Sequence, residues 1–90
     1  MNKKELVKSV SIATGLSERK CLKALDATTR LIQACVARGE SVKIYNFGAF
    51  ERKIRKARRF VNKRGVTDMP ATPEVRFRAA TQFKQMIKGK

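Results

Sequence analysis

The stretch VKIYNFGAFERKIRKARRFVNKRG, residues 42–65, decides the fold of this 90-residue chain. It opens with alternating apolar and polar residues, which predicts a strand, and the turn signal Asn46-Phe47-Gly48 follows. We expect Gly48 to allow a positive φ angle in that turn. A second strand starts near Ala49 and runs into residues 52–64, where eight of thirteen residues are Lys or Arg and none is acidic. So many charges cannot lie in a packed core, because each would lose its hydration, and the segment must project into solvent or lie against a negatively charged partner.

The residues after this stretch predict that the chain returns beside it. The next turn signal is Asn62-Lys63-Arg64-Gly65, and residues 66–69 can form the partner strand. Pro70 and Pro73 predict an edge or a junction rather than a central strand. Residues 75–77 predict a short final strand, and from about Ala79 a last helix carries Phe83, Met86 and Ile87 on one face.

The first forty residues predict a helical hairpin. Asn2 can cap a first helix and Gly15 can end it in the left-handed conformation. Ser17 caps a second helix, in which apolar residues recur at helical spacing over residues 18–37, and Gly39 ends it.

Together these patterns predict one α+β domain, residues 1–90, with the element order ααβββα. We expect a helical dimerisation base over residues 1–40, a three-stranded antiparallel sheet over 41–78 with a protruding β-ribbon arm at about 52–70, and a short C-terminal helix over 79–90. A chain this short buries a modest core, and a protruding arm makes the core smaller still. We therefore expect a homo-oligomer.

The net charge is +15, and it is unevenly divided between the two halves of the chain. Residues 1–50 carry nine basic and four acidic residues, and residues 51–90 carry thirteen and three. Nucleic acid is the commonest partner that offers so many closely spaced negative charges. A disordered basic tail is the alternative, but 42% apolar residues with clear periodicity argue against it.

The sequence offers no chemistry for a metal, a cofactor or catalysis. It has no His, no Gly-rich phosphate loop and no paired carboxylates on one element. Cys21 and Cys35 lie fourteen residues apart in one predicted helix, about 21 Å along its axis, so we expect both to be free and buried as small apolar residues. We expect no catalytic site, no metal, no cofactor and no association with a membrane.

Several local strings resemble the HU/IHF family of bacterial histone-like DNA-binding proteins. They are MNKKEL at 1–6, TGLS at 14–17, KALDA at 23–27, RGESVKIYNFGAFERKIRKARR at 38–59, MPA at 69–71 and VRFRAATQFK at 75–84. The resemblance covers essentially the whole chain. Its most specific elements are Phe47-Gly48-x-Phe50, the following Arg55 and Arg58, and Phe77 before the last helix.

The resemblance implies an intertwined dimer in which two helical hairpins form a base and the strands form a saddle above it. Phe47, Phe50 and Phe77 would then be the aromatic core of the dimer. Two β-ribbon arms would embrace duplex DNA through its minor groove. The matching positions imply DNA contacts from Lys3, Lys53, Arg55, Arg58, Arg59, Asn62, Lys63, Arg64, Arg78 and Lys84.

The tip of the arm departs from the family pattern. The family usually has Asn followed by a proline that wedges between base steps, whereas Lys63 follows Asn62 here. Phe60 and Val61 are adjacent apolar residues near this tip, and apolar side chains other than proline also intercalate. Either residue is therefore a candidate wedge.

The resemblance and the charge predict a nucleoid-associated protein of the HU type. We expect it to be cytoplasmic, in the bacterial nucleoid, and to bind duplex DNA with little sequence preference, bending and condensing it. A site-specific, IHF-like bending factor is the main alternative, and a heterodimer with a paralogue would also fit. RNA binding is a less favoured primary function, with secondary RNA binding retained, because the arm offers few exposed aromatic residues for base stacking.

Overall fold

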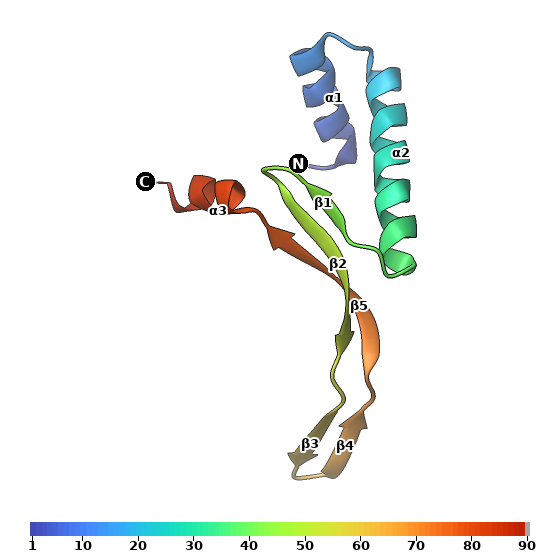
Figure 1. Cartoon of the computed structure of the whole chain (residues 1–90), viewed down its shortest axis with the longest axis vertical. Coiled ribbons are helices and arrows are strands. Elements are labelled where there is room, and N and C mark those ends of the chain that lie inside the picture. The colour runs from blue at the N-terminus through green and yellow to red at the C-terminus, as the bar shows by residue number, and fades with distance from the viewer. Residues whose placement is uncertain (90) are drawn as a thin grey trace. The chain divides into compact units, whose positions relative to one another are not determined.

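The computed structural model describes residues 1–89, with only the backbone at Phe60 and Asn62. The chain divides into two compact units, residues 1–34 and 35–90. In chain order (Figure 1), the elements are α1 (Lys3–Thr14), α2 (Glu18–Ala37), β1 (Val42–Ile44), β2 (Gly48–Arg55), β3 (Arg58–Asn62), β4 (Gly65–Met69), β5 (Thr72–Ala79) and α3 (Thr81–Lys88). No helix among the described residues is long and apolar enough to cross a membrane.

The predicted helical hairpin is confirmed, and its caps are those that the sequence indicated. The Asn2 side chain accepts a hydrogen bond from the Glu5 backbone N–H at 2.9 Å, which satisfies one of the donors left open in the first turn. Gly15 ends α1 in the left-handed region, with φ 77°. The Ser17 hydroxyl accepts from the Lys20 N–H at 3.2 Å and so caps α2.

The predicted sheet and arm are also confirmed, but an interruption between them divides the chain into more strands than predicted. The first sheet has the order β1-β2-β5, with both pairs antiparallel, and β3 and β4 form a separate two-stranded ribbon. The chain therefore has five strands where the periodicity predicted three. We call the β2–β5 pair the inner ribbon and the β3–β4 pair the outer ribbon.

The two ribbons continue one another without a change of register. Arg55 pairs with Thr72 and Arg58 with Met69, so two residues of each strand separate the two ladders. In this register Ala57 stands opposite Pro70. Because proline has no backbone N–H to donate, the ladder is interrupted there. Pro73 lies within β5, which is an edge strand of its sheet and tolerates the missing donor.

The turn before β2 corrects one prediction. The positive φ angle lies at Asn46, with φ 63°, and not at Gly48. Asn adopts this conformation more readily than most residues. Gly48 is required for another reason: a Cβ built there would lie 2.5 Å from Phe77 Cζ and 2.7 Å from the Arg78 carbonyl oxygen.

Four phenylalanine rings cluster beside this turn. The Phe47 ring centroid lies 5.3 Å from that of Phe77 and 5.5 Å from that of Phe83, and Phe50 lies 5.0 Å from Phe77. The backbone N–H of Ala80 donates to the Phe47 carbonyl at 3.0 Å, which holds the start of α3 against the turn. The close approach of ring to backbone at Gly48 makes this packing possible.

A single chain buries little of its apolar surface. Among the described side chains, the buried apolar residues are Val7, Cys21, Val36 and Ala49. Both cysteines are free, as predicted, but only Cys21 is buried and Cys35 is half-buried. Phe47 remains 42% exposed and Phe77 41% exposed, so the aromatic cluster is open on one side.

Candidate nucleic-acid interface

The inner ribbon has one apolar face and one charged face. Alternate residues of a strand share a face, and the register places Phe50 opposite Phe77 and Ile54 opposite Pro73 on the apolar side. The other side, including the neighbouring position of β1, carries Lys43, Glu51, Lys53, Arg55, Glu74, Arg76 and Arg78. Five of these seven residues are basic and two are acidic, so this face has a formal charge of +3. We call it the cationic face.

Two predicted DNA contacts from β2 lie on the cationic face and are exposed. Lys53 and Arg55 make no ion pair or side-chain hydrogen bond with the other residues that the structure describes. Arg52, between Glu51 and Lys53, belongs to the opposite face, where its guanidinium donates to the Ala37 carbonyl at 3.4 Å. The strand alternation thus separates basic residues that face solvent from one that contacts the protein.

Arg78, predicted from β5, also lies on the cationic face, but it has a partner. Its guanidinium lies 3.7 Å from Glu51 Oε2. The other oxygen of this carboxylate, Oε1, is buried and has no hydrogen-bond partner among the described residues. Glu51 therefore lowers the charge of the cationic face next to Arg78.

The structure adds Arg76 and Lys43 to this face, and the sequence reasoning missed both. Arg76 stands opposite Glu51 in the ladder, and Lys43 stands opposite Ala49. The signal was present in the string VRFR at 75–78, where Arg76 and Arg78 are two residues apart and so share a face of a strand.

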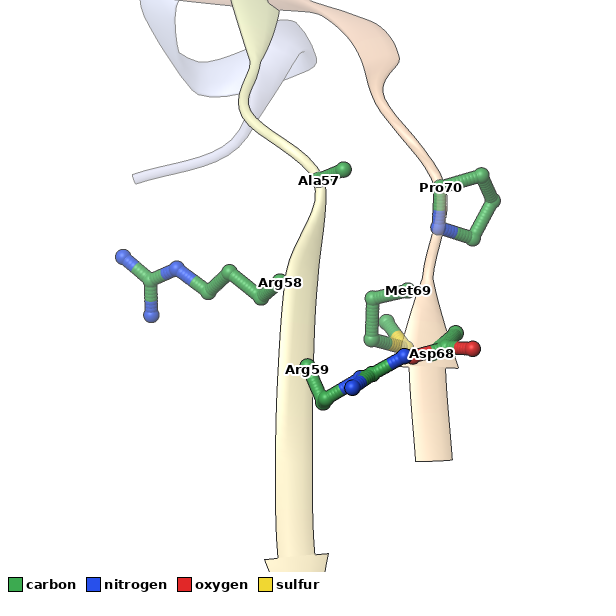
Figure 2. Close-up of a pocket in the computed structure, with 6 residues that line it drawn as sticks. All are labelled: Ala57, Arg58, Arg59, Asp68, Met69 and Pro70. Atoms are coloured by element: carbon green, nitrogen blue, oxygen red, sulfur yellow. The ribbon is translucent and has the colours of Figure 1, made fainter. Parts of the chain in front are cut away.

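The outer ribbon carries Arg58 and Arg59 on opposite faces (Figure 2). Arg58 extends away from the ribbon and makes no ion pair with a described residue. Arg59 reaches across to Asp68, which stands directly opposite it, with 3.2 Å between Nε and Oδ1. An open hollow of about 430 Å³ lies here, where the ladder is interrupted, and it is lined by Ala57, Arg58, Arg59, Asp68, Met69 and Pro70.

The two candidate wedge residues belong to opposite faces of the outer ribbon. Phe60 pairs with Thr67 and Val61 pairs with Val66. Val61 is 76% exposed and Val66 56% exposed, so this cross-strand pair is an apolar patch in solvent. The side chains of Phe60 and Asn62 lie outside what the structure describes. The register therefore gives each candidate wedge residue its own face of the ribbon.

The remaining predicted contacts are dispersed. Lys63 and Arg64 form the turn between β3 and β4, and Lys84 is exposed on α3. Lys3 belongs to the helical unit, where its Nζ lies 2.6 Å from Asp26 Oδ1. The structure thus brings together Lys53, Arg55 and Arg78 on one face and places the others on the outer ribbon, its turn or the helices.

The sequence profile of the family described as bacterial DNA-binding protein matches residues 1–88. The chain belongs to this family, known as the HU/IHF family. The DNA-binding protein HU of Clostridium pasteurianum is 34% identical over 89 residues, covering 97% of this chain and 98% of the relative. HU of Geobacillus stearothermophilus is 33% identical over 90 residues, covering 98% of this chain and 100% of the relative.

Solved structures of the HU/IHF family show the same fold. An Anabaena HU–DNA cocrystal structure matches with a TM-score of 0.90 and 30% identity, covering 100% of both chains. HU from Thermotoga maritima matches with a TM-score of 0.70 and 25% identity, covering 97% of this chain and 98% of that one. The predicted helical hairpin, sheet with arm and C-terminal helix are those of the family.

Proposed function

We propose that this chain is an architectural protein of the bacterial nucleoid that binds duplex DNA with low sequence specificity and bends and compacts it. The observation that carries the proposal is the cationic face of the sheet, where Lys53, Arg55 and Arg76 lie beside one another and opposite a face of phenylalanines. The cocrystal structure of Anabaena HU with DNA, which matches this chain along its whole length, supports the same conclusion.

The chemistry of the cationic face suits a phosphate backbone. Each Lys or Arg that neutralises a phosphate releases condensed counterions, which favours binding to any sequence. The outer ribbon is two strands wide, and β-ribbons of this kind enter the minor groove in architectural proteins. Such contacts read groove shape and backbone more than base edges, so low sequence specificity follows.

We also propose that residues 1–90 act as one domain of a homodimer. The rings of Phe47 and Phe77 are only half-covered, and Leu31 and Met86 are 66% and 77% exposed, so each of the two units leaves large apolar side chains in solvent. A second copy that covers these residues would close the aromatic cluster. A heterodimer with a related chain would cover the same surface and is distinguished by mass measurement of the protein purified from its host.

A titration with two end-labelled duplexes of equal length tests the proposed function. One duplex is intact and the other carries a central nick, and energy transfer between the ends is read while salt is varied. We expect tight binding, a steep salt dependence, preference for the nicked duplex and a shortened end-to-end distance.

The other outcomes would each change the conclusion. Equal binding without shortening would indicate a protein that coats DNA without bending it. Preference for one sequence by orders of magnitude would indicate a site-specific bending factor. Binding to structured RNA but to neither duplex would overturn the proposal.

A further inference from the structure

The outer ribbon has two faces that differ in charge. Arg58 belongs to one face, together with Thr67 and Met69 of the opposite strand. We call this the Arg58 face, and it has a formal charge of +1. The other face, which we call the Asp68 face, carries Arg59, Val61, Val66 and Asp68, and its formal charge is zero.

Asp68 is responsible for this difference. It is the one acidic residue between positions 52 and 73, in a segment otherwise dense in Lys and Arg. It stands directly opposite Arg59 in the ladder, and both side chains are 72% exposed. The pair is therefore a surface ion pair that holds Arg59 across the ribbon, while Arg58 has no carboxylate partner among the described residues.

We propose that Asp68 selects the face of the arm that meets DNA, an inference that rests on the proposed function. A phosphate that approaches the Arg58 face meets a guanidinium without a competing anion. A phosphate that approaches the Asp68 face must displace a carboxylate that is held opposite the guanidinium by the register, and it is itself repelled by that carboxylate. The exposed valines beside the pair add no hydrogen-bond donor for the backbone of DNA.

Salt-resolved binding of matched variants to one duplex tests this inference. We expect Arg58→Gln to flatten the slope of log K against log salt by about 1.8, the value of one lost phosphate contact on each of the two arms of the dimer. Arg59→Gln should flatten the slope less than Arg58→Gln does, since the charge of Arg59 is paired with Asp68. Asp68→Asn frees Arg59 on both arms and should steepen the slope by up to about 1.8. Adding Arg59→Gln to Asp68→Asn should return the slope to that of the wild type.

A second measurement locates the DNA directly. Val66 and Thr67 are adjacent residues on opposite faces, so a DNA-cleaving reagent attached to Cys in Val66→Cys or Thr67→Cys, each in a Cys35→Ala background, reports which face is near the duplex. We expect strong cleavage from position 67 and weak cleavage from position 66. In an Asp68→Asn background the difference should become smaller.

The outcomes separate this inference from the function on which it rests. A wild-type chain that binds no duplex would overturn both. A wild-type chain that binds DNA would overturn only the role of Asp68 if Arg59→Gln flattened the slope as much as Arg58→Gln, or if Asp68→Asn left the slope and the cleavage pattern unchanged. Thermal melting of each variant guards against a loss of folded protein.

Discussion

The inner and outer ribbons have the same antiparallel pairing and an unbroken register, yet different forces orient them. The inner ribbon has an apolar face on which Phe50 and Phe77 pack with centroids 5.0 Å apart, so burial decides which side faces the protein. The outer ribbon carries an exposed Val61–Val66 pair on the face of the Arg59–Asp68 ion pair, and neither residue is buried. Because neither valine of the outer ribbon is buried, we expect the arrangement of charges to determine which face of that ribbon meets DNA.

This comparison predicts that substitutions in the two ribbons act on different properties. Changes on the apolar face of the inner ribbon and in the turn before it should lower the free energy of unfolding, because these residues form the aromatic cluster. Changes in the outer ribbon should alter DNA binding while the stability stays nearly constant.

The largest effect on stability is expected for Phe47→Ala. Its ring contacts those of Phe50, Phe77 and Phe83, and deletion of such a ring typically costs about 3–5 kcal/mol. Urea unfolding at several protein concentrations measures the loss, since the midpoint of a dimer depends on concentration. Tyr45→Ala is the control: this aromatic residue of the same turn is 91% exposed, and its loss should cost no more than about 0.5 kcal/mol. Equal midpoints for the two variants would place Phe47 outside the core.

A smaller loss is expected for Gly48→Ala. The added methyl group would overlap the Phe77 ring and the Arg78 carbonyl oxygen, and overpacking of this kind costs about 1–3 kcal/mol. A second substitution, Phe77→Leu, removes the overlap with the ring and leaves the overlap with the Arg78 carbonyl oxygen. If steric overlap is the cause, the double variant should be more stable than the sum of the two single losses predicts, whereas simple additivity in urea unfolding would contradict it.

Removing Arg55 and Arg58 together should barely affect folding. Both are exposed and without ion pairs to described residues, so Arg→Ala at both positions should change the free energy of unfolding by less than about 1 kcal/mol. The salt dependence of DNA binding should nevertheless flatten by about 3.6 in log–log slope, since each of the two arms of the dimer loses two phosphate contacts. An unchanged slope would remove these residues from the interface.

The smallest effect on stability is expected at the tip of the arm, where bending rather than affinity should change. Phe60→Ala and Val61→Ala remove apolar side chains from opposite faces. If an apolar wedge opens a base step, only the variant on the DNA side should reduce the bend angle measured by end-to-end energy transfer. Equal bend angles for both variants and the wild type would exclude a wedge at either residue.

Much of the fold could be predicted because its signals are local. The caps at Asn2 and Ser17, the helical stop at Gly15 and the change from helical to strand periodicity at Val42 each depend on a few neighbouring residues, and each is confirmed. The prediction that was wrong concerns a contact between residues far apart in the sequence. Gly48 is needed because Phe77, twenty-nine positions away in the chain, packs onto its backbone, and no local pattern contains that information.

The candidate interface also combines features that are visible locally in the sequence with features that depend on strand pairing. The density of Lys and Arg in residues 52–64 predicted the segment that would bind DNA, since charge is a property of composition. Arg76 was missed as a member of the cationic face, and the pairing of Arg59 with Asp68 was not foreseen, because both depend on which residue stands across the ladder. The register places Arg76 on the cationic face and Arg59 opposite Asp68.

The sequence by itself determined the family, the helical hairpin, the strand that leads into a basic arm, and the partner class that so much positive charge demands. Only the tertiary structure decided which basic residues face outward together and which are paired, and why Gly48 cannot be another residue. The physical reason is that periodicity and charge are carried by neighbours along the chain. Pairing partners and close approaches are set by residues far apart in sequence that the antiparallel register brings to the same place.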